Sequence, residues 1–409
     1  MPQKCSKSWK SSNRFYTFEK MKHYDYIFTG AGLSALMTVY EMAVSGKFLD
    51  KNILLLDQNP KKTNDRTWCF WEQTNGKFDA IVSKKWKLAV FANENFNRIL
   101  DINPYEYKMI AGLDFYDFVF AEISLHPNIE FVNQKVNSFI EKDDLVFVET
   151  ALETFSCGKL FNSIYNPESA LSQQNFPVLQ QHFIGWKIKT EQKIFNPELP
   201  TFMDFSIPQN GNTRFMYVLP TSETEALLEY TLFSKDLLPE TEYETGIENY
   251  IPKLGISSYE IMEKERGQIP MTSYKFWKNN TKNILNIGSA GGWTKASTGY
   301  TFKNTVKKSK ALVEFLQHRN DFRKFHKSDK FWFYDLLLLD ILNDKNQLGS
   351  SIFASMFKTG NPALIFKFLD EETSLYEDLK VILKCPKRLF INALLRRMLY
   401  FWRRKTIKR

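Results

Sequence analysis

A glycine-rich turn between two predicted elements constrains this chain more than any other feature. Residues 26–35 read Tyr-Ile-Phe-Thr-Gly-Ala-Gly-Leu-Ser-Ala. Residues 24–29 have the β-branched and aromatic composition of a buried strand, and residues 34–45 have the pattern of a helix. Glycines in such a turn leave no Cβ near a phosphate, and the helix N terminus offers unpaired N–H groups to it. The predicted contacts to a dinucleotide in this turn are Gly30, Ala31, Gly32, Leu33 and Ala35.

A second apolar run supports the same interpretation. Residues 52–57 read Asn-Ile-Leu-Leu-Leu-Asp, which predicts a buried strand ending in a carboxylate. Asp57 follows the glycine turn at the distance from which an acidic side chain binds a ribose hydroxyl. Strand, helix, second strand and acid together predict a dinucleotide-binding βαβ unit. An ordinary βαβ unit, in which the glycines only shape a turn, is the alternative.

Composition bounds the class of protein. The chain has 409 residues, of which 15% are aromatic, including 36 Phe. This aromatic content exceeds the usual needs of a core and suggests an apolar pocket or a membrane-facing surface. No apolar run reaches the ~18 residues of a membrane-spanning helix. The four cysteines lack C-x-x-C spacing, so we expect no metal site and a reducing compartment.

The two ends of the chain are basic. Residues 1–22 are lysine-rich and lack the apolar segment of a secretory signal, so we expect a dispensable extension, with Met1 or Met21 as the start. Residues 385–409 contain nine bases and no acid, and apolar side chains recur there at helical spacing. This pattern is typical of a helix lying on an anionic membrane. A helix docked on the core and a nucleic-acid arm are alternatives, but the chain has no recognisable nucleic-acid module.

The order of predicted elements indicates an α/β fold in several parts. Strand and helix patterns alternate at the start, short strands dominate the middle, and helices follow residue 305. We expect a discontinuous nucleotide-binding domain of residues 23–90 and 260–310. We expect a mainly β substrate domain of residues 91–259, a helical region of residues 311–384 and the basic tail of residues 385–409.

Two further segments are candidate cofactor contacts. Residues 65–71 read Asp-Arg-Thr-Trp-Cys-Phe-Trp, and Arg66 and Thr67 there could meet a phosphate or carboxylate. Residues 288–302 are glycine-rich after a predicted strand, which lets a backbone approach a flat ligand at Gly288, Gly291 and Gly292. A surface loop with aromatic anchors and a flexible loop are the respective alternatives.

Two acidic segments are candidates for proton chemistry. Glu229 is a lone acid in the apolar run of residues 226–233, where alternation places it on one face with Leu227 and Thr231. Desolvation favours the acid form of such a carboxyl, as a general acid requires, although a solvent-facing strand carboxylate is the commoner case. Residues 368–373 read Phe-Leu-Asp-Glu-Glu-Thr, and Ser374 with Glu377 predicts a capping box that starts a helix. The acids before it could simply complement that helix dipole.

Taken together, these segments resemble the lycopene cyclase family in its plant and bacterial flavoprotein branch. The matching stretches run in order from about residue 24 to 385, nearly the whole chain. They read GAGLSA with Asp57, DRTWCFWE, QHFIGWKIKT, RFMYVLP with LLEYT, ERGQIPM, STGYTF and FLDEET.

The resemblance implies a fold like the FAD-dependent hydroxylases and a reaction that closes the linear ends of lycopene into β-ionone rings, giving γ-carotene and then β-carotene. It implies no net redox change, with reduced FAD required and NAD(P)H serving only to reduce it. Glu229 matches the family's essential acid, and Glu371 and Glu372 match an acidic pair. Which of these acids donates the proton, or whether the flavin does, stays open. Related hydroxylases carry Gly-Asp where this chain has Gly288 and Ser289.

The expected partners follow from that substrate. A C40 hydrocarbon is held by bilayers, so we expect a peripheral protein on the cytoplasmic side of an anionic membrane, beside other carotenoid-pathway enzymes, and no nucleic acid. The alternatives are an FAD- and NAD(P)H-dependent monooxygenase or prenyl-chain reductase, and a flavin-binding membrane scaffold without catalysis.

Overall fold

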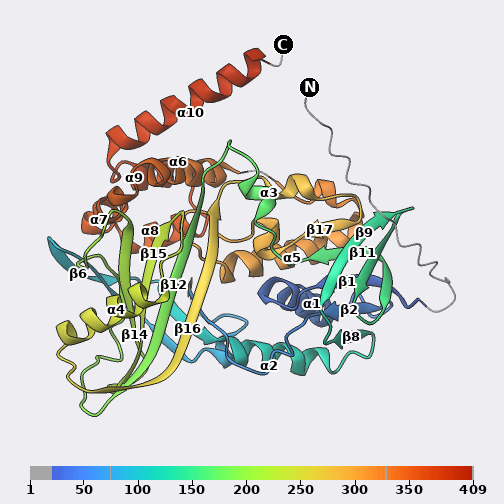
Figure 1. The fold of residues 1–409 in the computed structure, drawn as a ribbon, viewed down its shortest axis with the longest axis horizontal. Helices are drawn as coiled ribbons and strands as arrows, with labels where there is room; N and C mark the ends of the chain where they lie inside the picture. The colour runs from blue at the N-terminus through green and yellow to red at the C-terminus, as the bar shows by residue number, and fades with distance from the viewer. Residues whose placement is uncertain (1–20, 74, 328, 408–409) are drawn as a thin grey trace, which may run out of the picture.

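A mixed seven-stranded sheet, parallel except for the two strands at one edge, forms the first half of the molecule (Figure 1). The computed structural model describes residues 21–73, 75–327 and 329–407, with side chains up to residue 402. The expected extension of residues 1–22 lies almost wholly outside this range. The sheet runs β8 (Ile129–Val132), β2 (Ile53–Leu56), β1 (His23–Thr29), β11 (Thr154–Asn162), β10 (Leu145–Thr150) and β9 (Val136–Lys142), with β17 (Ile284–Asn286) beside β11. Strand β1 pairs in parallel with β2 and β11, so the glycine turn leaves the carboxyl end of a central strand.

Three helices cover one face of this sheet. Helix α1 (Leu33–Ser45) packs against α2 (Gly112–Ile123) and α5 (Phe302–His318), and their apolar side chains form one core with strands β1 and β2. Helix α1 is buried over most of its length, which the run of apolar residues after the glycine turn requires. The predicted βαβ unit is therefore confirmed as structure.

A second seven-stranded sheet forms the other half. Its order is β16 (Tyr259–Thr272), β12 (Val178–Thr190), β15 (Glu225–Ser234), β14 (Thr213–Pro220), β13 (Thr201–Asp204), β5 (Leu88–Asn93) and β6 (Phe96–Asp101). A three-stranded sheet of β3 (Thr67–Gln73), β7 (Tyr105–Ala111) and β4 (Lys84–Trp86) contributes to the same core. Helix α4 (Glu240–Tyr250) packs on the opposite face, where Ala226, Leu228 and Tyr230 point.

Sheet membership differs from the boundaries expected from sequence. Strands β8 to β11 fall within residues 91–259 but belong to the first sheet, whereas β16, which lies in the expected nucleotide-binding part except for its first residue, belongs to the second. Local alternation identifies a strand, but it carries no information about which distant strand will pair with it. The α/β class and the helical C-terminal region are confirmed.

The helical region continues beyond α5. It comprises α6 (Lys330–Asp344), α7 (Gly349–Thr359), α8 (Pro362–Leu369), α9 (Leu375–Ile382) and α10 (Lys387–Ile407); a short helix, α3 (Glu168–Leu171), precedes β12. The capping box at Ser374 and Glu377 is confirmed, with both hydrogen bonds present. Among the described residues, no helix combines the length and the apolar character needed to cross a bilayer.

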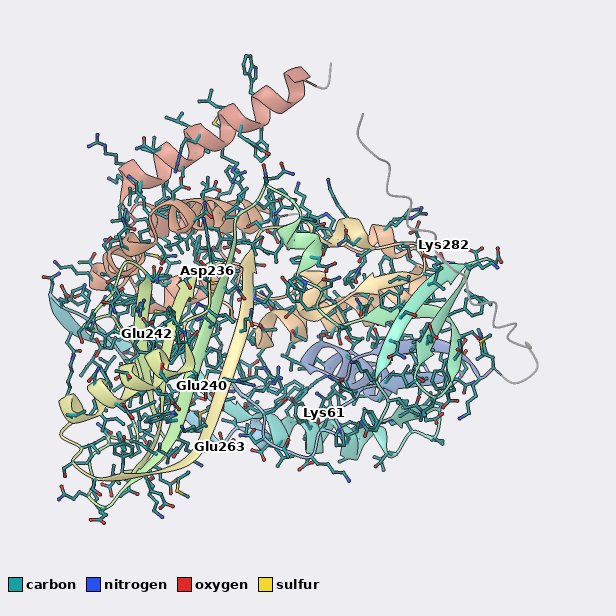
Figure 2. All side chains as sticks on the ribbon, viewed as in Figure 1. Lys61, Asp236, Glu240, Glu242, Glu263 and Lys282 are labelled. Atoms are coloured by element: carbon teal, nitrogen blue, oxygen red, sulfur yellow. The ribbon has the colours of Figure 1, made fainter. Side chains whose placement is uncertain are left out.

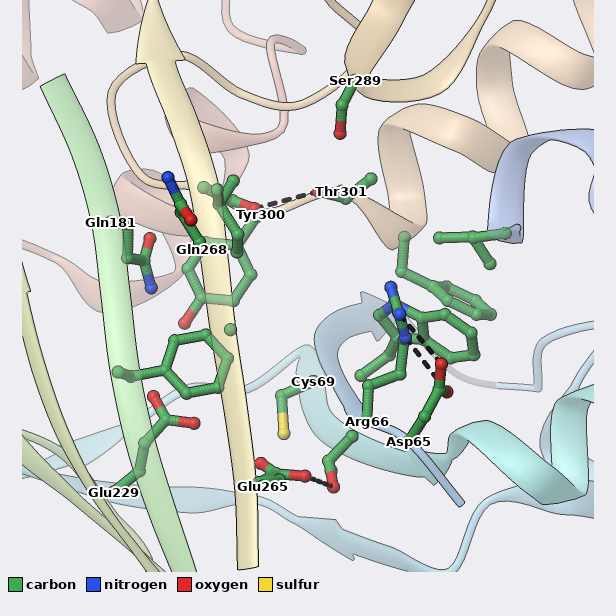
Figure 3. Close-up of a pocket in the computed structure, with 18 of the residues that line it drawn as sticks. Asp65, Arg66, Cys69, Gln181, Glu229, Glu265, Gln268, Ser289, Tyr300 and Thr301 are labelled. Atoms are coloured by element: carbon green, nitrogen blue, oxygen red, sulfur yellow. Dashed lines mark hydrogen bonds and ion pairs between the residues drawn. The ribbon is translucent and has the colours of Figure 1, made fainter. Parts of the chain in front are cut away.

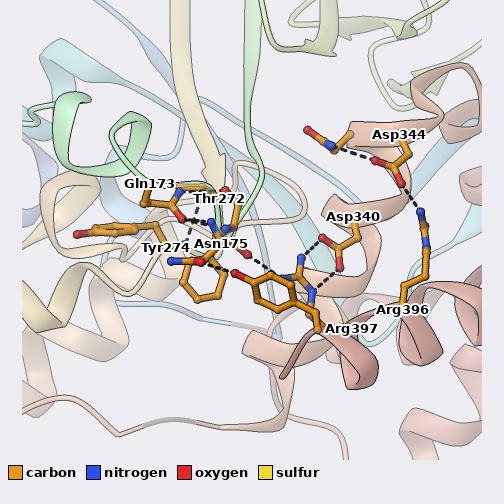
Figure 4. Close-up of polar contacts among 11 residues, drawn as sticks. Gln173, Asn175, Thr272, Tyr274, Asp340, Asp344, Arg396 and Arg397 are labelled. Atoms are coloured by element: carbon orange, nitrogen blue, oxygen red, sulfur yellow. Dashed lines mark hydrogen bonds and ion pairs between the residues drawn. The ribbon is translucent and has the colours of Figure 1, made fainter. Parts of the chain in front are cut away.

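Helix α10 lies along the edge of the molecule and is attached mainly to α6 (Figures 1 and 4). Ala393 and Leu394 pack with Leu337 and Ile341, so part of the expected membrane-facing stripe is instead a docking face. Arg397 donates from Nε to Asp340 at 2.8 Å and from a terminal nitrogen to the Asn175 carbonyl at 2.7 Å. The bases from residue 403 onward lie outside the described side chains.

Candidate active site

A cavity of about 400 Å³ lies where the two large sheets meet. The glycine turn, the start of β3, strands β12, β14, β15 and β16, and the 288–302 loop all contribute to its wall. Gly32, Leu33, Arg66, Thr67 and Gly288, five of the residues expected to contact a cofactor, line it together with Glu229. One end of this cavity is therefore formed by the predicted dinucleotide turn, and the other end carries the acid Glu229.

Two glycines, Gly30 and Gly32, shape the end of the pocket that the glycine turn forms. Gly30 adopts a φ of +86°, which an L side chain rarely takes, and a Cβ there would lie 2.4 Å from Ser163 Oγ. A Cβ at Gly32 would meet nothing within 4 Å, and no side chain caps the N terminus of α1. Open space and free N–H groups at this helix end suit a pyrophosphate.

Asp57 and the alanines of the turn support this end without lining the pocket. Asp57 Oδ2 accepts the Ala31 N–H at 2.6 Å and lies 3.5 Å from Lys61 Nζ. Lys61 in turn lies over the ring of Tyr116 on α2 and is labelled in Figure 2. Ala31 and Ala35 are fully buried, as close packing of helix and strand requires.

The 65–69 segment crosses the middle of the pocket (Figure 3). Asp65 accepts two hydrogen bonds from the Arg66 guanidinium, at 3.1 and 2.9 Å, and one from Tyr116 at 2.7 Å. This arrangement holds Arg66, which is half-exposed, at the cavity. The Thr67 hydroxyl points the other way and donates to Glu265 Oε2 at 2.8 Å.

The 288–302 loop closes the pocket from the first sheet, but its glycines have different roles. Gly288 has a φ of +59°, and a Cβ there would lie 2.4 Å from Ser34 Oγ, so a glycine is required where the loop meets α1. Gly291 lines a different cavity, and Gly292 does not line the pocket; both shape the turn after β17. The structure thus does not bring these two to the pocket.

Glu229 projects into the pocket from β15 on the face predicted from alternation, beside Leu227. Thr231 donates a hydrogen bond to Glu229 Oε1. Burial raises the pKa of Glu229 well above its ordinary value and the negative charge of Glu265 raises it further, while the Thr231 bond opposes both. The carboxyl is therefore poised to keep its proton near neutral pH.

Glu265 is a functional candidate that the sequence did not single out. It lines the same pocket from β16, and burial raises its pKa, an effect that the hydrogen bond from Thr67 opposes. The charged residues that alternate along β16 have the pattern of a solvent-exposed strand, so local sequence does not mark Glu265 as a pocket residue. Its position within the ERGQIPM motif is the one sequence feature that could have identified it.

Aromatic side chains form the wall around these acids. The hydroxyls of Tyr107 and Tyr217 lie 3.4 and 3.5 Å from that of Tyr300, and burial raises the pKa of all three. Phe183 of β12 and Cys69 of β3 complete this end. Figure 3 shows both glutamates at the end of the pocket away from Ser289.

Glu371 and Glu372 are not brought to this pocket. They follow α8, where Glu371 is 2.9 Å from the buried Lys295 ammonium and Glu372 is 2.7 Å from Lys307. Burial opposes ionisation of Glu371, but the charge of Lys295 and its hydrogen bond outweigh it and lower the pKa. A carboxyl with a lowered pKa holds its proton poorly, so this geometry argues against the predicted role as proton donor.

Comparison with known proteins gives the family. The model of the family described as "Lycopene cyclase protein" matches residues 25–395. The chain belongs to the lycopene cyclase family. It is 24% identical to the lycopene beta-cyclase of Pantoea ananas over 300 residues, 69% of this chain and 72% of that one. It is 26% identical to the lycopene beta-cyclase of a Paracoccus species over 165 residues, 39% of this chain, and the match spans only 42% of that protein's length.

Solved structures share the fold of this cyclase-family chain. A geranylgeranyl bacteriochlorophyll reductase-like protein from Thermoplasma acidophilum superposes with a TM-score of 0.59 at 12% identity, covering 91% of this chain and 99% of that one. A flavoprotein/dehydrogenase from Cytophaga hutchinsonii gives 0.61 at 10% identity, covering 91% and 99%. A flavin-dependent brominase gives 0.57 at 12% identity, covering 94% and 100%. The fold is therefore that of the FAD-dependent hydroxylase class.

Proposed function

We propose that this chain is a lycopene β-cyclase that converts the linear ends of lycopene to β-ionone rings and requires reduced FAD. One observation carries the proposal. Glu229, a carboxyl whose pKa burial raises, stands in the same cavity as the dinucleotide turn at Gly32. An acid in an apolar pocket beside a nucleotide site suits proton-initiated chemistry next to a flavin.

The residues at the turn end fit FAD. Gly32 and the uncapped start of α1 leave room and N–H donors for the pyrophosphate. Asp57, which follows β2 and accepts the Ala31 N–H behind the turn, is the acid that we assign to the adenosine ribose. Arg66 and Gly288 line the same cavity and would hold the rest of the cofactor. When bound and reduced, with NAD(P)H as the external reductant, FAD supplies negative charge beside a developing cation.

Glu229 performs the initiating step in this proposal. Its Oε1 accepts from Thr231, which leaves Oε2 to carry the proton to the terminal double bond of the substrate. The tertiary cation that results is attacked by the neighbouring double bond, which closes the ring. Phe183 and Tyr217 line the cavity, where aromatic rings can exclude water and attract a cation.

We also propose that helices α9 and α10 dock on an anionic membrane, from which the substrate is taken. Exposed apolar side chains occur on both helices: Leu375, Tyr376, Leu379, Ile391, Leu395, Met398, Leu399 and Trp402. Lys387, Arg388 and Arg396 are exposed bases on α10. Apolar side chains beside bases are the pattern of an interfacial helix. Flotation with phosphatidylglycerol vesicles, but not with phosphatidylcholine alone, is the expected result.

Expression in a lycopene-accumulating bacterium tests the activity. We expect wild-type protein to convert the pigment to β-carotene and Glu229→Gln to lower conversion by about 10²–10⁴-fold. Glu225→Gln is the matched control, because Glu225 lies on the same strand, faces Lys189 and does not line the pocket. Unchanged lycopene beside folded, flavin-loaded wild-type protein would refute the proposal and favour assays of net NAD(P)H consumption.

A further inference from the structure

The two pocket carboxyls flank a residue without a side chain. Gly185 of β12 is the register partner of Glu229 on β15 and of Glu265 on β16. Residues directly opposite each other in an antiparallel sheet point to the same face, so these three form one row across the sheet. A Cβ at Gly185 would lie 3.1 Å from Glu265 Cγ and 3.1 Å from Leu227 Cδ1. The side chain of Glu265 therefore occupies the space above the glycine, toward Glu229.

Neither carboxyl forms an ion pair among the described residues, although the charge of Arg66 acts to lower the pKa of Glu265 against the larger effect of burial. Glu229 accepts only the Thr231 hydroxyl, and Glu265 only the Thr67 hydroxyl, among the residues that the structure describes. Two carboxyls so placed in an apolar cavity do not both ionise, because each charge disfavours the other and burial disfavours both. At most one of the two is therefore ionised, and when the pair holds a single proton one member is an acid and the other a base.

The groups that face this pair do not compete for that proton. Cys69 comes from β3, Tyr107 from β7, Tyr217 from β14 and Tyr300 from the 288–302 loop, and burial raises the pKa of each, so they stay neutral. Arg66 stays cationic and is held by Asp65. Glu263, farther along β16, is bound by Asn64 at 2.8 Å and does not line the pocket.

We propose that Glu265 is the base of the reaction that Glu229 starts; this inference rests on the proposed cyclase function. The O–H bond of Glu229 breaks as a C–H bond forms at the terminal double bond. Ring closure moves the positive charge to a ring carbon. The adjacent C–H bond then breaks, its electron pair becomes the ring double bond, and its proton passes to Glu265. Transfer of that proton across Gly185 restores the starting state with no net redox change.

The choice of base determines where the ring double bond forms, which gives a readout that a structural role would not change. Glu265→Gln keeps an oxygen for the Thr67 hydrogen bond but cannot accept the proton. We expect β-ring formation to fall by about 10²-fold or more. Glu229 still protonates the substrate in this variant, so the cation must lose a proton from another position or revert to lycopene. When the reaction is run in D₂O, we therefore expect rings with a displaced double bond, or deuterium in the recovered lycopene.

Two variants serve as comparison. Glu265→Asp retains a base and is expected to form β-rings only, and Glu263→Gln is expected to match the wild type. The inference is overturned if Glu265→Gln forms β-rings alone at the wild-type yield. It is equally overturned if a folded Glu265→Gln gives neither displaced rings nor labelled lycopene. If the wild type itself forms no ring, the proposed cyclase function fails. The wild-type measurement alone therefore separates failure of the proposed function from failure of the role assigned to Glu265.

Discussion

The acids after α8 offer a sharp test of what the structure implies, because two adjacent glutamates have opposite environments. Glu371 bonds to Lys295, whose side chain is 2% exposed and also contacts Asp335 at 2.9 Å. Glu372 bonds to Lys307 in a pair whose side chains are 44% and 38% exposed. Neither lines the pocket. Conversion of each to glutamine removes one charge with little change of shape.

The expected magnitudes follow from burial. A hydrogen bond to a charged group contributes about 1.5–3 kcal/mol, and the glutamine oxygen keeps a weaker bond to Lys295, so Glu371→Gln should destabilise by ~1–2 kcal/mol. Exposed pairs contribute about 0–1 kcal/mol, so Glu372→Gln should change stability by less than ~0.5 kcal/mol. The lowered pKa of Glu371 means that its contribution is present at neutral pH and is lost as pH falls through that pKa.

Two assays check this contrast. Urea unfolding at pH 7 and at pH 4 measures the free energy of unfolding, and the difference between wild type and Glu371→Gln should shrink at the lower pH. Pigment conversion measures the chemistry, and both variants should retain it within about twofold at temperatures where they are folded. Loss of conversion in either variant without loss of stability would show that these acids act on the substrate and that the reasoning from their ion pairs is wrong.

Three other predictions follow from the geometry. Gly185→Val places a side chain between the two pocket carboxyls, so conversion should fall at least ~10-fold while circular dichroism stays native; wild-type conversion would contradict the paired arrangement. Because burial raises the pKa of both Glu229 and Glu265, the rate in vesicle assays should pass through a maximum near neutral pH, falling at higher pH as Glu229 loses its proton and at lower pH as Glu265 gains one; a rate that keeps rising above neutral pH would be the contrary result. Arg397→Ala breaks a largely buried pair with Asp340, so trypsin should cut within 387–407 at least ~10-fold faster, whereas Arg396→Ala, in an exposed pair with Asp344, should not change cleavage.

Local features were predictable because they depend on neighbours in the chain. The glycine turn, helix α1 and the capping box at Ser374 each involve residues within a few positions, and the structure has all three. The face of Glu229 follows from alternation alone. These are cases in which steric and hydrogen-bonding rules act over one turn or one strand.

Long-range pairing was not predictable in the same way. Glu265 becomes a pocket residue only because β16 pairs with β12 in a register that places it opposite Gly185, and nothing in the local sequence fixes that register. The allocation of β8 to β11 to the first sheet has the same origin. Lys295, the ion-pair partner that lowers the pKa of Glu371, is 76 residues away along the chain.

That distant lysine also explains how the acidic segment can matter to the pocket without entering it. The carbonyl of Lys295 accepts the N–H of Thr298 at 3.2 Å and of Gly299 at 2.8 Å, and its own N–H donates to the Tyr300 carbonyl at 2.9 Å. The backbone of this loop therefore closes on the residue whose side chain Glu371 and Asp335 hold. Tyr300 in the same loop lines the pocket and meets the hydroxyls of the neighbouring tyrosines. Loss of the Glu371 charge is therefore expected to weaken the anchoring of this loop, which lowers stability while the side chains that line the pocket stay in place.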